Sequence, residues 1–228
     1  MNINYAKMDS TFDEIYALLV TNYLFPGFAD SMKKWESPDW KNEDDTFSLE
    51  VTRAQNSHIG YTNNVMAKYL GQFQNQIPPK ILQSFRGWTC FKDGKLLAIS
   101  DSKGLVDGAR HIYFLLDHLD NKLKKLNASH FTSCCHNYLF EFSEGCFSDY
   151  DKQQLSDGIQ KLSSSYPRTF DKIIASAYDN VLYFLSDGTC FEDNVPTQEF
   201  TRLAILYRKS SNWQKGTSYS EIRKHLLK

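Results

Sequence analysis

The chain has 228 residues, of which 41% are hydrophobic and 23% are charged, and its formal net charge is −1. This composition is typical of a globular protein with one sizeable core, and it excludes disorder, collagen-like repeats and coiled coil as descriptions of the whole chain. No apolar run approaches the roughly 18 residues that a membrane helix needs, so we expect no membrane partner.

Two features of the sequence bear on the cellular compartment. The first residues, MNINYAKMDSTFDE, place acidic side chains where a secretory signal peptide has its apolar stretch. The five cysteines are odd in number and lack paired spacing, which is typical of reduced thiols rather than of a disulfide framework. We therefore expect a cytoplasmic protein. Its oligomeric state and protein partners stay open.

Charge is distributed unevenly along the chain. Residues 1–50 hold four Lys and Arg against ten Asp and Glu, whereas residues 199–228 hold seven against two. An acidic patch and a basic tail fit a metal centre beside a phosphate-binding face. They also fit two solvated surfaces that complement each other, and on charge alone this second interpretation is favoured.

The first half of the chain contains five predicted elements. Thr11 and Glu14 form a capping box at the start of a helix that ends before Pro26-Gly27. Residues 46–52 alternate apolar and polar side chains without a break, which predicts a strand. A helix over 59–70 is followed by two strands, 87–91 and 96–100, joined by an Asp-Gly turn.

The second half predicts helices and strands in alternation. Residues 109–126 form a long amphipathic helix, and 137–143 is a near-continuous apolar run typical of a strand buried on both faces. Ser148-Asp-Tyr-Asp151 caps a further helix, and 172–177 and 181–185 are paired strands. Helical segments near 198–207 and 219–227 complete the chain. The order predicts an α/β domain over 1–197 and a small, basic, helical C-terminal segment over 198–228.

The most informative residues are two carboxylates. Asp39 follows Pro38 just before the predicted strand, and Glu50 lies on the polar face of that strand. Two carboxylates brought to one strand end suit Mg²⁺, a hard cation that takes oxygen ligands and keeps several waters. Such a metal activates water and stabilises the charge that develops on a phosphodiester.

At these residues the chain resembles the PD-(D/E)XK, or restriction-endonuclease-like, nuclease superfamily. The resemblance rests on Pro38-Asp39, on Glu50-Val51-Thr52, and on the order helix, acidic hairpin, long helix and buried strand over about residues 10–145. It implies a mixed sheet flanked by helices, with Asp39 and Glu50 as metal ligands. The family's lysine stands at the position of Thr52, so the motif here is degenerate.

The missing lysine has a candidate replacement. Some members of the superfamily carry this lysine on the following helix, and here the long helix supplies Lys122 and Lys125, which share a face. Arg53 points to the opposite side of the strand from Thr52. The alternative interpretation is structural: Asp39 caps a turn, Glu50 is a solvated strand residue, and the two lysines are helix-end charges favoured by the macrodipole. Glu14 is a further candidate ligand, although its capping role already explains it.

A group of cysteines and histidines suggests zinc less strongly. Its members are His130, Cys134, Cys135, His136 and Cys146, a spacing that matches no established finger. Buried thiols acting as small hydrophobes are the better interpretation.

Two functions of different classes follow from the sequence. The first is a Mg²⁺-dependent nuclease acting on DNA, or a degenerate relative, with Asp39 and Glu50 binding metal and Lys122 or Lys125 replacing the motif lysine. The second is a non-catalytic binding or interaction module of a defence or mobile-element system, which Thr52 and the near-zero net charge favour. A zinc enzyme built on the cysteine–histidine group is a third.

Overall fold

The computed structural model describes residues 10–54, 61–62, 65–66, 68–85, 89–99, 110–129, 131, 134–143, 146–177, 180–210 and 218–220. The chain divides into two compact units. Residues 9–54 and 111–228 belong to the larger one, here called the sheet unit, and residues 55–110 belong to the smaller one, here called the inserted unit. The inserted unit was not predicted from the sequence. The boundary predicted at residue 197 stays a prediction.

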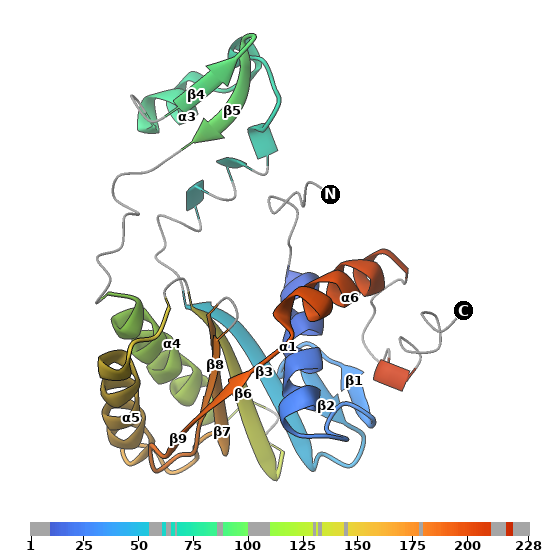
Figure 1. Cartoon of the computed structure of the whole chain (residues 1–228), viewed down its shortest axis with the longest axis vertical. Helices are drawn as coiled ribbons and strands as arrows, with labels where there is room; N and C mark the ends of the chain where they lie inside the picture. The colour runs from blue at the N-terminus through green and yellow to red at the C-terminus, as the bar shows by residue number, and fades with distance from the viewer. Residues whose placement is uncertain are drawn as a thin grey trace. The chain divides into compact units, whose positions relative to one another are not determined.

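A mixed sheet of seven strands forms the centre of the sheet unit (Figure 1). The strands, in their order across the sheet, are β1 Met32–Lys34, β2 Trp40–Asn42, β3 Phe47–Ala54, β6 His136–Ser143, β7 Lys172–Ala177, β8 Asn180–Phe184 and β9 Cys190–Asn194. The central strands β3, β6 and β7 are parallel, and the other neighbours are antiparallel. The predicted α/β class is therefore confirmed.

The register of the parallel strands assigns side chains to the two faces of the sheet. Glu50 of β3 pairs with Leu139 of β6, and Leu139 pairs with Ile173 of β7. Paired residues of neighbouring strands point to the same side, and successive residues alternate. Glu50, Leu139 and Ile173 therefore share one face, and Phe140 lies on the other.

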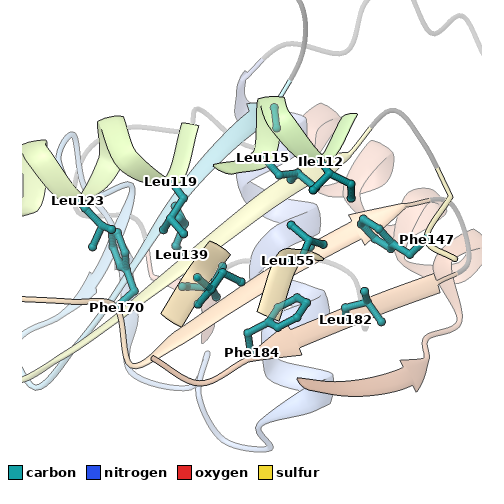
Figure 2. Packing of buried hydrophobic residues seen from close by; sticks show 14 of the residues in the cluster. Ile112, Leu115, Leu119, Leu123, Leu139, Phe147, Leu155, Phe170, Leu182 and Phe184 are labelled. Carbon is teal, nitrogen blue, oxygen red and sulfur yellow. The ribbon is translucent and has the colours of Figure 1, made fainter. Parts of the chain in front are cut away.

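Helices cover both faces of this sheet. They are α1 Ser10–Leu24, α4 Arg110–Leu126, α5 Asp149–Ser163 and α6 Thr197–Ser210. The core on the Leu139 face comes from α4 and α5, and Figure 2 shows their side chains pointing toward those of the sheet. Leu115, Leu119 and Leu123 are at most 1% exposed, and each such leucine contributes roughly 1.5–3 kcal/mol by burial. This packing holds α4 against β3 and β6.

The opposite face is covered by α1, and α6 packs against α1. Tyr16 meets Phe140 edge to face, with ring centroids 6.3 Å apart, and Tyr23 meets Phe200 of α6 at 5.7 Å. The side chains of α1 are consequently buried from residue 12 through residue 20, acidic ones included. The predicted helix is therefore correct, and its side chains from residue 12 through residue 20 are enclosed.

The inserted unit has a small core of its own. A hairpin joins β4 (Thr89–Lys92) to β5 (Lys95–Ile99) through Asp93 and Gly94, whose φ angles are 51° and 72°. Two residues with positive φ are what a type I′ turn requires, and Asp-Gly is a favoured pair. A short helix, α3 (Pro79–Ser84), begins with proline in its first turn, where no hydrogen bond is lost. The core consists of Val65, Tyr69, Ile77, Phe85, Leu96 and Ile99.

Most of the predicted elements are present. The strand at 46–52, the Asp-Gly hairpin, the helix at 109–126, the strand at 137–143 and the paired strands at 172–185 correspond to β3, β4–β5, α4, β6 and β7–β8. Residues 61–62, 65–66 and 68–69 are helical within the helix predicted for 59–70. The Thr11 side chain and residues 221–227 lie outside the described part of the chain. The short strands β1, β2 and β9 were not predicted.

Candidate functional site

Asp39 is held opposite Glu50 by the pairing of β2 with β3. Trp40 pairs with Leu49 in an antiparallel register, and one further step along that register sets Asp39 across from Glu50. The Asp39 Oδ2 atom accepts a hydrogen bond from the backbone N–H of Val51 at 2.7 Å. This bond extends the strand pairing through a side chain and fixes Asp39 at the start of β2.

Glu50 lies within β3 below α4 and is only 3% exposed. Its Oε1 atom accepts hydrogen bonds from Lys122 Nζ at 2.7 Å and from Lys125 Nζ at 2.6 Å. Its Oε2 atom is buried and has no hydrogen-bond partner. The structure thus brings Glu50 and both predicted lysines into direct contact, and the interpretation of Glu50 as a solvated strand residue is wrong.

The Glu50 carboxylate contacts more positive charge than it needs for neutralisation. A single ammonium would balance the carboxylate, but two are present, and their side chains keep 21% and 38% of their surface exposed. A buried carboxylate needs a partner because removing a charge from water is costly. The second ammonium is in excess of the charge of Glu50 itself.

Asp39 is electrostatically coupled to Glu50. The pKa of Asp39 is raised from 3.8 to about 7, mainly by burial and then by the negative charges of Glu50 and Glu14. The hydrogen bond from Val51 and the charge of Lys34 act in the opposite direction. A carboxyl with a raised pKa beside a second, buried carboxylate is an arrangement that occurs often at functional sites.

A third buried carboxyl, Glu141 of β6, was not predicted. It pairs with Thr52, so it shares the face of Glu50, and it is 2% exposed. Its Oε1 atom has no hydrogen-bond partner, and burial raises its pKa well above the usual range, while the charge of Lys122 lowers it. A single acidic residue inside an otherwise apolar strand is the sequence signal that could have revealed it.

Arg53 and Glu14 have partners of their own on the α1 side of the sheet. The Nε and Nη2 atoms of Arg53 donate to the two carboxylate oxygens of Asp13, and the distance from Nε to Oδ2 is 2.6 Å. Arg53 therefore points away from Glu50, as the alternation predicts. Glu14 forms an ion pair with Lys34. That pair fixes the Glu14 carboxylate. The negative charge of Glu14 acts on the site by raising the pKa of Asp39.

The donor set suits magnesium better than zinc. Among the residues that the structure describes, no group of three or more His, Cys, Asp or Glu side chains is arranged to hold a metal ion. Mg²⁺ needs less, because it binds through one or two carboxylates and keeps its remaining ligands as water or substrate oxygen. Asp39 and Glu50 supply two such carboxylates, and the unpartnered Oε2 atom of Glu50 is a free donor. These residues therefore fit Mg²⁺.

The cysteine–histidine group does not gather into a site in the described residues. Cys134 is buried, and its backbone N–H donates to Asn137 Oδ1 at 3.1 Å. Cys135 and Cys146 are exposed, so the interpretation of these thiols as buried hydrophobes holds for Cys134 alone. His130 lies outside the described residues.

No helix in the described residues is both long and apolar enough to cross a membrane. Comparisons with protein-family models, with curated proteins and with solved structures found no match for this chain.

Proposed function

We propose that this chain is a Mg²⁺-dependent nuclease that hydrolyses phosphodiester bonds in DNA, or a degenerate relative of one, with a restriction-endonuclease-like fold. The observation that carries the proposal is the Glu50 carboxylate, which is buried, contacts two ammonium groups through one oxygen, and has no partner for the other. A buried polar atom without a hydrogen bond costs roughly 1–3 kcal/mol. A bound cation would offset this cost.

The order of the elements supports the proposal. A helix, an antiparallel β1–β2–β3 meander, the helix α4 and the parallel strand β6 follow one another along the sheet unit. This is the order on which the resemblance to the PD-(D/E)XK superfamily rests, and it sets Asp39 and Glu50 on adjacent strands. The replacement of the motif lysine by Thr52 is the main departure.

The roles of the side chains follow from their contacts. Asp39 and Glu50 would hold the metal, which supplies water activation and stabilisation of negative charge at the phosphate. Lys122 and Lys125 orient the Glu50 carboxylate through Oε1 and leave Oε2 unoccupied. The ammonium that is not needed to balance Glu50 can donate a hydrogen bond to a phosphate oxygen or to the attacking water, which is the task of the missing lysine.

The same contacts also favour a second candidate, a non-catalytic binding module. Two lysines already neutralise Glu50 without a metal, and Thr52 cannot supply an ammonium. In that case the lysines would serve only to stabilise a buried charge, and the chain would act through partners, as in the predicted defence or mobile-element role.

Cleavage of DNA distinguishes the two candidates. Supercoiled, linear and single-stranded DNA are incubated with the protein and Mg²⁺ or Mn²⁺, and EDTA serves as the metal-free control. We expect cleavage by the wild type and none by Glu50→Gln, which keeps the shape and hydrogen-bonding oxygen but removes the charge. Glu192→Gln, at an exposed ion pair with Lys152, is the matched control and should cleave normally. Equal residual cleavage by wild type and Glu50→Gln would identify a contaminant and refute the catalytic proposal.

A further inference from the structure

The inserted unit differs in charge from the rest of the chain. Residues 55–110 contain seven Lys and Arg, three Asp and no Glu, which gives a net charge of +4. The remaining residues contain nineteen Lys and Arg and twenty-four Asp and Glu, which gives −5. The near-zero charge of the whole chain therefore conceals a basic unit joined to an acidic one. A basic module is what contact with phosphate groups requires.

Four lysines of the inserted unit lie in its described residues, and none of them has a neutralising acid among those residues. Among the described residues, no ion pair involves Lys68, Lys80, Lys92 or Lys95, and all four are exposed. In the sheet unit, by contrast, seven lysines form ion pairs with Asp or Glu. The positive charge of the inserted unit is thus available to an external anion.

An aromatic ring lies exposed beside one of these lysines, which in turn pairs with a second lysine. Lys92 and Lys95 face each other across the hairpin turn, and the Lys95 Nζ atom lies 5.1 Å from the centre of the Phe73 ring. Phe73 is 46% exposed and is not part of the core of this unit. The backbone next to it is fixed, because the N–H of Gln74 donates to the carbonyl of Gly94 at 2.9 Å. We call Phe73, Lys92 and Lys95 the hairpin surface.

We propose that the inserted unit binds single-stranded nucleic acid through the hairpin surface, with a base stacked on Phe73 and phosphates contacted by Lys92 and Lys95. An exposed ring beside positive charge is the combination that binds an unpaired base and its backbone. Stacking on a ring requires a base that is free of its pairing partner, which favours a single strand over a duplex. The inference rests on the proposed function, since it names the form of nucleic acid that the chain would receive.

Chain connectivity relates this surface to the candidate site. The inserted unit departs from the end of β3, which carries Glu50, and returns at the start of α4, which carries Lys122 and Lys125. The inserted unit is therefore joined through the chain to two of the elements that contribute to the candidate site, β3 and α4.

The test measures binding without cleavage. The full chain is titrated into a fluorescein-labelled oligothymidylate in EDTA, and anisotropy gives the affinity over a range of salt concentrations. Lys92→Gln/Lys95→Gln should lower the slope of log affinity against log salt by about 1.4, since each phosphate contact on a single strand contributes about 0.7. Phe73→Ala and Phe73→Leu should each weaken binding about tenfold and leave the slope unchanged. Lys161→Glu, at an exposed position of α5, changes the net charge equally and should bind as the wild type does.

The inference is overturned if the wild type does not bind the oligothymidylate, if it binds a duplex more tightly, or if the hairpin variants behave as Lys161→Glu does. Thermal unfolding of each variant shows whether it is folded, and Phe73→Leu keeps apolar volume if Phe73→Ala does not fold. Binding in EDTA is independent of the metal. Binding without cleavage would therefore remove the proposed function alone, and cleavage without an effect of the hairpin variants would remove this inference alone.

Discussion

Replacing Asp39 by Asn should stabilise the protein at high pH and change its stability little at low pH. The ordinary pKa of this carboxyl is 3.8, and in the folded chain it is about 7, mainly because of burial and of the Glu50 charge. Between these two values the folded state binds more protons than the unfolded state does. Stability must therefore fall as the pH rises through this window. Asn removes the charge and retains an oxygen that can accept the Val51 N–H.

The size of the effect follows from the two pKa values. A rise from 3.8 to about 7 corresponds to a cost of roughly 4 kcal/mol once Asp39 is fully ionised, at about pH 8. At pH 5 most of this cost is absent, because the folded carboxyl is still protonated. Between pH 5 and pH 8 the gain from Asp39→Asn should grow by about 2 kcal/mol, with some of the full value lost to relaxation and solvent.

Urea unfolding at pH 5, 6, 7 and 8 measures this gain directly. Asp30→Asn removes an exposed carboxylate in the same region and serves as the control for the change in net charge. The reasoning is refuted if Asp39→Asn and the wild type differ by the same free energy at all four pH values. It is also refuted if Asp39→Asn is the less stable protein at pH 8.

Three further predictions concern stability. Lys122→Met and Lys125→Met should each lower the free energy of unfolding by less than about 1 kcal/mol, because the other ammonium keeps its contact with Glu50. The double variant should lower it by about 3 kcal/mol or more. If urea unfolding shows that the two single effects simply add up to the double one, the lysines do not share this role. Glu141→Gln should leave the stability unchanged at pH 5 and raise it at pH 8, because the raised pKa of this buried acid makes its ionisation costly. A destabilised variant at pH 8 would show that the negative charge is needed. Gly188→Ala should lower the free energy of unfolding by about 2 kcal/mol or more, since the φ of Gly188 is 85° and an added Cβ would lie 2.6 Å from a backbone carbonyl of α5. An unchanged melting temperature would refute this prediction.

Elements with strong local signals were predictable from the sequence. The alternation around Leu49 and the apolar stripe of α4 each specify one period and one buried face, and β3 and α4 follow them. The Asp93-Gly94 turn is equally local, because its two residues tolerate positive φ. In these places the local preference and the tertiary packing agree.

The short strands show where local signals end. β1 and β2 have three residues each, and they are strands only because Lys34 pairs with Trp40 and Trp40 with Leu49. β9 is largely polar and exists through its pairing with β8. Such strands are formed by tertiary contacts, so no period in the sequence reveals them.

The candidate site was predictable in its residues but not in its electrostatics. The spacing of Asp39 and Glu50, with two lysines on a later helix, was enough to select Glu50, the two lysines that contact it, and Asp39, whose pKa the charge of Glu50 raises. The burial of Glu50 could not be foreseen, because it depends on α4 closing over β3. Glu141 escaped attention for the same reason. The inserted unit was missed because its composition, apart from its basic charge, is that of an ordinary globular segment.

The central claim is that Asp39 and Glu50 hold a divalent cation, and thermal unfolding during a Mg²⁺ titration tests it most directly. A ligand of the folded state stabilises it by about 1.4 kcal/mol at a concentration ten times its dissociation constant. The wild type should therefore melt at a higher temperature as Mg²⁺ is added at constant ionic strength, and Glu50→Gln should not. No rise in the wild type, or an equal rise in both proteins, would contradict the claim.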